Sequence, residues 1–111
     1  MKIASTKTMT DFLNKELKNQ GVNDIHFRYI AIPQDVYRRY VNMDIWEAEY
    51  NGDFNYKTGK YRAIEVEYPD EYYACNRYLT SNDLRRIFTR WQLHIKNAED
   101  FAKLVIEEMA I

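Results

Sequence analysis

Residues 44–68 read DIWEAEYNGDFNYKTGKYRAIEVEY, and this stretch decides the fold class of the chain. Polar and apolar side chains alternate along 45–50 and again along 61–68, which is typical of β-strands with one face towards a core. Two turn signals interrupt the alternation, at Asn51-Gly52 and at residues 57–60 (KTGK). The pattern predicts antiparallel strands that meet at one of these turns, and it leaves open which turn closes the hairpin.

Further strands are expected on both sides of this stretch. Residues 25–32 (IHFRYIAI) are rich in β-branched and aromatic side chains and are partly apolar on both faces, which favours a central strand. Pro33 ends that strand. Residues 72–79 (YYACNRYL), after Pro69-Asp70, are predicted to form a further strand of the same meander.

Helices are expected where apolar residues recur at helical spacing next to a capping residue. The first begins at Thr8 or Thr10 and ends at Gly21, a typical C-terminal cap. A short helix over residues 34–42 follows Pro33. Thr80, with an acid three residues on, begins a later helix, and Asn97 caps the last one.

The segment after Thr80 carries two competing patterns. Leu84, Ile87, Phe88 and Trp91 lie on one helical face, but apolar residues also alternate from Trp91 to Ile95 as in a strand. We favour a helix over residues 81–89 followed by a strand over 90–95. A single helix as far as residue 96 is the alternative.

These elements predict an α+β fold in one domain spanning residues 1–111. Runs of antiparallel strands between helices favour a two-layer sandwich. In it, an antiparallel meander of about four to five strands packs against the N- and C-terminal helices.

Composition excludes several classes of protein. A single cysteine, Cys75, rules out a disulfide scaffold, and charged residues interrupt every apolar run before it could cross a membrane. Residues 1–20 lack the apolar centre of a secretory signal, so we expect a cytoplasmic location. Three glycines provide neither a phosphate-binding loop nor a dinucleotide fingerprint.

Motifs for metals, cofactors and nucleophiles are missing too. His26 and His94 have no metal-binding spacing and are expected to be half-buried structural side chains. Cys75 is expected to be a small buried residue. We therefore expect no metal, no cofactor and no catalytic residues.

Charge is segregated along the chain, although the net charge is only −1. Two segments contain acids and no base: Asp44, Glu47, Glu49 and Asp53 in residues 40–56, and Glu65, Glu67, Asp70 and Glu71 in residues 63–76. Residues 84–98 contain bases and no acid: Arg85, Arg86, Arg90 and Lys96. If these groups stay clustered on the folded surface, the molecule has an acidic side and a basic side.

The segregated charges and the ten tyrosines favour a non-enzymatic interaction module that binds a protein partner. Its contact surface would be an acidic, Tyr-rich β-ribbon: Glu47, Glu49, Asp53, Tyr56, Tyr61, Glu65 and Glu67. In composition alone, such a chain resembles accessory proteins of mobile genetic elements.

Two other functions are considered. A nucleic-acid-binding domain would use basic and aromatic side chains: Arg38, Arg39, Arg85, Arg86, Arg90, Trp91 and Lys96. A small metal-dependent hydrolase would use the carboxylates of the two predicted strands, although these fit a solvated sheet face better. Exposed strand edges also allow a homodimer, and no membrane partner is expected.

Overall fold

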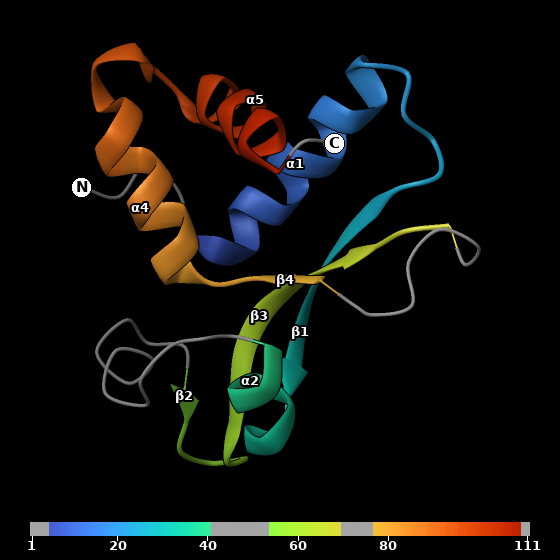
Figure 1. Cartoon of the computed structure of the whole chain (residues 1–111), viewed down its shortest axis with the longest axis vertical. Helices are drawn as coiled ribbons and strands as arrows, with labels where there is room; N and C mark the ends of the chain where they lie inside the picture. The colour runs from blue at the N-terminus through green and yellow to red at the C-terminus, as the bar shows by residue number, and fades with distance from the viewer. Residues whose placement is uncertain (1–4, 41–53, 70–76, 110–111) are drawn as a thin grey trace.

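The computed structural model describes residues 5–40, 54–69 and 77–109, with the backbone only at residues 39 and 40. In these ranges helices flank an antiparallel sheet, which confirms the α+β class and is consistent with a two-layer sandwich (Figure 1). The helical elements are α1 (Thr6–Asn19), α2 (Gln34–Tyr40), α4 (Ser81–Trp91), the 3₁₀ turn η1 (Gln92–His94) and α5 (Ala98–Glu108). The strands are β1 (His26–Ile32), β2 (Phe54–Asn55), β3 (Lys60–Glu67) and β4 (Arg77–Leu79).

β3 is the central strand of the sheet. β1 pairs antiparallel along one edge of it, from His26 opposite Glu67 to Ile32 opposite Tyr61. β2 pairs with residues 60–61 and β4 with residues 64–66, so both lie along the other edge. In a simple meander each strand pairs with the next one in sequence, whereas here β1 lies beside β3. Residues 56–59 connect β2 to β3, so the KTGK signal closes this hairpin; Asn51-Gly52 lies outside the described residues.

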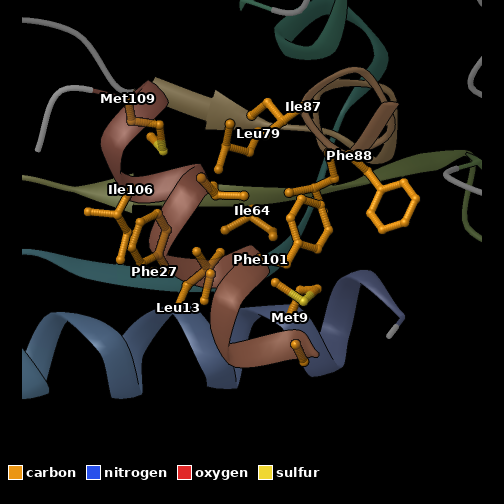
Figure 2. Close-up of a cluster of buried hydrophobic side chains, with 14 of the residues drawn as sticks. Met9, Leu13, Phe27, Ile64, Leu79, Ile87, Phe88, Phe101, Ile106 and Met109 are labelled. Atoms are coloured by element: carbon orange, nitrogen blue, oxygen red, sulfur yellow. The ribbon is translucent and has the colours of Figure 1, made fainter. Parts of the chain in front are cut away.

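The main hydrophobic core lies between one face of the sheet and helices α1, α4 and α5. Phe27 and Ile64 point from the sheet towards Leu13 of α1 and Phe101 of α5 (Figure 2). The rings of Phe101 and Phe88 meet edge to face, with centroids 5.5 Å apart. Burial of these side chains is what holds the three helices to the sheet.

A second, smaller core covers the opposite face of the sheet. Tyr37 of α2 packs against Ile32, Tyr61 and Ala63, and all four are buried. Neighbouring residues of β3 point to opposite faces, so Ala63 serves this core and Ile64 the main one. Figure 1 shows α2 over the end of the sheet that lies away from the other helices.

The first helix begins earlier than its sequence predicts. Ser5 is the N-cap, and its hydroxyl accepts a hydrogen bond from the Thr8 amide at 3.1 Å. Thr10 is buried inside the helix and donates to the Thr6 carbonyl. Gly21 follows the C-cap with a φ of +77°, a left-handed conformation that favours glycine and confirms the predicted end.

The capping signals of the last two helices are confirmed. Thr80 and Asp83 form a capping box, in which each side chain accepts from the other residue's backbone N–H. Asn97 caps α5 by accepting from the Asp100 amide at 2.8 Å.

The predicted strand over residues 90–95 is wrong. Residues 90 and 91 complete α4, and residues 92–94 form the 3₁₀ turn η1. The helical stripe that ends at Trp91 packs on the core, and Arg90 and Trp91 both bond to Glu108 of α5. A strand over residues 90–95 would place Leu93 on the same core-facing side as Trp91 and Ile95, whereas Leu93 is 91% exposed.

Candidate functional site

The acidic β-ribbon predicted as a contact surface is described in part only. Glu65 and Glu67 lie on β3, and Glu47, Glu49 and Asp53 lie outside the described residues. Arg28 lies directly opposite Glu65 on β1, and its Nη1 is 2.7 Å from Oε1 of Glu67. The hydrogen bond from Arg28 to Glu67 and the charge of Glu67 raise the pKa of Arg28 above its ordinary value. The two described carboxylates thus face a cation on the neighbouring strand.

The two tyrosines assigned to this surface lie in different environments. Tyr61 is only 2% exposed and stacks on Tyr37 in the second core, with ring centroids 4.3 Å apart. The structure therefore places Tyr61 in the core, because its face of β3 is covered by α2. Tyr56 is 76% exposed in the turn between β2 and β3.

A continuous series of aromatic rings connects the exposed Tyr56 to the second core. Phe54 meets Tyr56 edge to face, with centroids 4.8 Å apart. The same Phe54 ring lies 4.8 Å from that of Tyr61, which in turn stacks on Tyr37. The exposed ring of Tyr56 therefore packs on Phe54, which in turn contacts the buried ring of Tyr61.

Hydrogen bonds organise the turn that carries Tyr56. The Asn55 side chain accepts from the Lys57 amide at 2.9 Å, and the Asn55 carbonyl accepts from the Gly59 amide at 2.8 Å. Gly59 has a φ of +68°, which a residue with a Cβ would adopt only with strain. We call residues 54–60 the hairpin tip. Lys57 and Lys60 are exposed on the hairpin tip. The sequence prediction left both of them out of the contact surface, although they belong to the turn signal next to Tyr56.

The basic residues grouped by sequence do not form one patch. Arg85, Arg86 and Arg90 are exposed on α4, and Lys96 is exposed beyond η1. Arg38 is exposed on α2, which packs on the opposite face of the sheet. The side chain of Arg39 is outside the described part of the structure.

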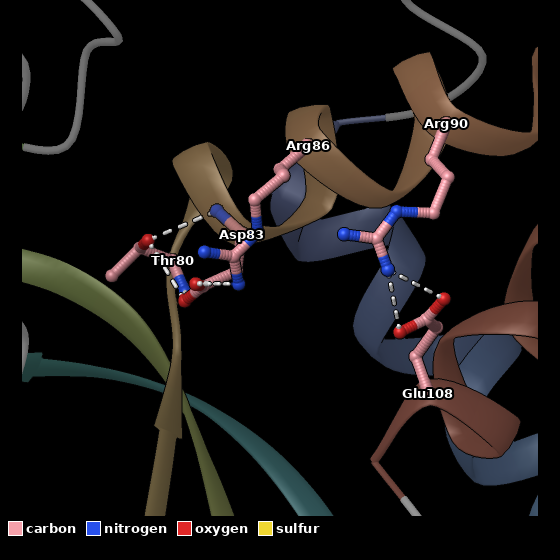
Figure 3. A network of polar contacts seen from close by, with 5 residues as sticks. All are labelled: Thr80, Asp83, Arg86, Arg90 and Glu108. Atoms are coloured by element: carbon pink, nitrogen blue, oxygen red, sulfur yellow. Dashed lines mark hydrogen bonds and ion pairs between the residues drawn. The ribbon is translucent and has the colours of Figure 1, made fainter.

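Acids lie close to the helical arginines. Arg86 pairs with Asp83 at 3.2 Å, one turn earlier on α4 (Figure 3). Nη1 of Arg90 donates to both carboxylate oxygens of Glu108, at 3.2 and 3.3 Å. The sequence predicts a basic side without acids, and this prediction is wrong at Arg86 and Arg90, because each of them pairs with an acid.

Trp91 takes part in the same contact with α5. Its indole N–H donates to Oε1 of Glu108 at 2.7 Å. This hydrogen bond and the positive charge of Arg90 hold the pKa of Glu108 below its ordinary value. Because Trp91 is half-buried and bonded to Glu108, it is poorly placed to stack on a nucleic-acid base.

The two histidines are exposed, so the expectation that they are half-buried is wrong. His26 lies on the same sheet face as the second core, but at the end of β1 that α2 does not cover. His94 lies in η1. Among the described residues, no three His, Cys, Asp or Glu side chains gather as a metal site would require. Cys75 is not among the residues described.

In the ranges that the structure covers, none of the helices combines the length and the apolar character needed to cross a bilayer. Compared with protein-family models, with curated proteins and with solved structures, the chain matches none of them.

Proposed function

We propose that this chain is an interaction module that binds a protein partner, with the hairpin tip as its anchor. The observation that carries the proposal is Tyr56, which is 76% exposed and yet supported by a series of rings that reaches the core. We keep the cytoplasm as the proposed location, because a chain with one cysteine has no need of an oxidising compartment.

Tyrosines placed in this way contribute strongly to binding. A tyrosine offers a large apolar ring and a hydroxyl at a small cost in side-chain entropy, since only two of its torsions become fixed. Where the fold already supports the ring, that cost falls further. Tyrosine is accordingly among the residues that dominate the binding energy of protein interfaces.

The charges around Tyr56 indicate the partner's chemistry. Lys57 and Lys60 are exposed in the same tip, and the carboxylates of β3, Glu65 and Glu67, lie about 17 Å and about 23 Å from Lys60 along the strand. A partner that holds Tyr56 in an apolar pocket with an acidic rim complements the tip best.

The acidic residues remain a separate proposed contact for a basic partner. Glu65 and Glu67 are half-buried beside Arg28 and can be neutralised without touching the tip. The E65Q/E67Q double variant tests this surface, and slower association at low salt is the expected result. Unchanged association would remove the acidic surface from the proposal.

The anchor is tested by photo-crosslinking. A benzoyl-phenylalanine at position 56 should form an adduct with one protein, and excess wild-type chain should compete with it. Position 93 is the matched control, because Leu93 is even more exposed, at 91%, but lies on η1. Adducts of the same kind at both positions, or adducts to nucleic acid alone, would contradict the proposal.

The contribution of Tyr56 to affinity is then measured by substitution, with the crosslinked protein as the binding partner. Tyr56→Ala should weaken binding by about 1–3 kcal/mol, because a rigid aromatic contact is lost. Tyr56→Phe keeps the ring and should retain most of the affinity. Equal binding by the alanine variant would exclude Tyr56 as the anchor.

Nucleic-acid binding through α4 is the second candidate. Arg85, Arg86 and Arg90, which are all exposed on α4, favour it. Reversing the charge of Arg86 and Arg90 should weaken binding to a DNA or RNA duplex and flatten its salt dependence. Arg38→Glu, on the other side of the sheet, is the control. If both changes act alike, a specific nucleic-acid surface on α4 is excluded.

A further inference from the structure

A half-open pocket of about 310 Å³ lies where β4, α4 and the end of α5 meet. Its polar wall is formed by arginines and acids: Arg77, Arg86, Arg90, Asp83 and Glu108. The remaining wall is formed by Tyr78, Leu79, Ile87 and Met109. None of its residues belongs to the hairpin tip.

Three arginines converge here because of the local structure. Arg86 and Arg90 are one helical turn apart on α4, so their side chains project on the same side, as Figure 3 shows. Arg77 comes from β4, which leads directly into α4 through Thr80. The sequence pattern suggested the helical pair and gave no reason to add Arg77.

Contacts within the fold orient each guanidinium through a single nitrogen. Arg86 bonds to Asp83 through Nη2, and Arg90 bonds to Glu108 through Nη1. Arg77 donates from Nη1 to the Met109 carbonyl at 3.0 Å and to the Tyr68 hydroxyl at 3.3 Å. Since a guanidinium has five N–H donors in a rigid fork, other donors remain for a ligand.

The charges on the pocket wall do not cancel. Asp83 and Glu108 offset Arg86 and Arg90, whereas the acceptors of Arg77 are a carbonyl and a phenol, which carry no formal charge. Among the described residues of the wall, one positive charge is therefore left uncompensated. An anion entering the pocket meets three preoriented forks and an excess of positive charge.

We propose that this pocket binds a phosphate group carried by a small phosphate ester or by the 5′ end of a nucleic acid. Guanidinium forks match the oxygens of phosphate in geometry and in charge. The volume is at the lower end of the range for small-molecule sites, so it suits a phosphate with a small attached group. This inference is independent of the hairpin tip and of the partner proposed for it.

The first experiment is a calorimetric titration of the full chain with inorganic phosphate at low salt. Binding with a dissociation constant of about 1 mM or lower is expected. Arg77→Gln should weaken it about tenfold, because a charged donor is lost. Arg85→Gln is the matched control: it removes the same charge from α4 at a residue that does not line the pocket, and it should change the affinity less than about twofold. Equal losses in both variants, or no binding by the wild type, would overturn the proposal.

A second pair of variants covers the possibility that Arg77→Gln does not fold, since Arg77 also holds the end of α5. Glu108→Gln removes a negative charge from the pocket wall and should tighten phosphate binding several-fold. Glu107→Gln, its exposed neighbour outside the pocket, should not. If the two glutamate variants behave alike, the pocket is not the binding site.

Competition separates the two sources of the phosphate. A short oligonucleotide with a 5′-phosphate is compared with the same strand lacking it, and with a mononucleotide. A 5′ end is the natural source if only the phosphorylated strand binds more tightly than inorganic phosphate, and a small ester is the source if only the mononucleotide does. Tyr56→Ala should bind phosphate normally, which distinguishes failure of this inference from failure of the proposed function.

Discussion

At the scale of single residues, Tyr61 should contribute much more than Tyr56 to the free energy of unfolding. Tyr61 is buried between Tyr37 and Phe54, so Tyr61→Ala should lower the free energy of unfolding by about 3–5 kcal/mol. Tyr56→Ala removes the edge-on contact with Phe54 from a side chain that is 76% exposed, so it should cost about 1 kcal/mol. Urea unfolding measures both, and equal destabilisation would show that Tyr61 is not a core residue.

Glu108 is a residue at which pH should affect stability. The Trp91 hydrogen bond and Arg90 lower its pKa in the folded state, from an ordinary value of 4.5. Its contribution is therefore complete above that value and is lost as the pH falls through the lower folded pKa. Glu108→Gln should make unfolding less sensitive to pH in this acidic range.

The measurement compares urea unfolding at neutral pH and near pH 3 in the two proteins. Glu107→Gln is the control, since Glu107 is the exposed neighbour of Glu108 on α5. If the glutamine variant at 108 lost as much stability on acidification as the wild type, Glu108 would not be the group responsible.

At the scale of elements, one side chain joins α1 to β1. Asn14 donates from Nδ2 to the Phe27 carbonyl and accepts the Phe27 amide at Oδ1, both at 2.8 Å. The amide thus pairs with the strand as a neighbouring strand would. Asn14→Leu should cost about 1–3 kcal/mol, because two backbone groups of Phe27 lose their partner.

Asn19→Leu is the matched control for this prediction, since Asn19 is exposed at the end of α1. Thermal unfolding of both variants gives the comparison. A loss at Asn14 no greater than the loss at Asn19 would mean that water replaces the amide without cost.

At the scale of the whole molecule, the two cores share one strand. Alternate residues of β3 serve each side, with Ile64 in the main core and Ala63 in the second. Because neither core can lose β3 and persist, the chain should unfold in a single transition. Far-UV circular dichroism and tyrosine absorbance should give the same midpoint, and two separate midpoints would show that the cores are independent.

Local signals in the sequence predicted much of the fold. Thr80 with Asp83, Asn97 and Gly21 mark helix ends correctly, because capping depends on hydrogen bonds within one turn. The strand over 90–95 failed because alternation and helical spacing were both present there. The helical conformation of Arg90 and Trp91 is stabilised by Glu108 of α5, which accepts a hydrogen bond from each of them.

The candidate site was predictable only in part. Sequence identified Tyr56 and the helical arginines but could not separate Tyr56 from Tyr61, which lies in the same alternating stretch. Burial of Tyr61 depends on α2 covering that face of the sheet, and a strand pattern does not show which helix covers it. Arg77 was missed for the same reason, since its neighbours in the pocket come from α4 and α5.

By itself, then, the sequence determined the fold class, one end of each described α-helix and the alternation of β3, because all of these follow from interactions between residues close in the chain. Only the tertiary structure decided which tyrosine stays exposed, which acids neutralise the helical arginines and where a third arginine joins them. Those outcomes depend on contacts between elements distant in sequence, such as Arg90 with Glu108 and Arg77 with Met109. Their free energy arises only once both partners have been brought together by the packing of the core.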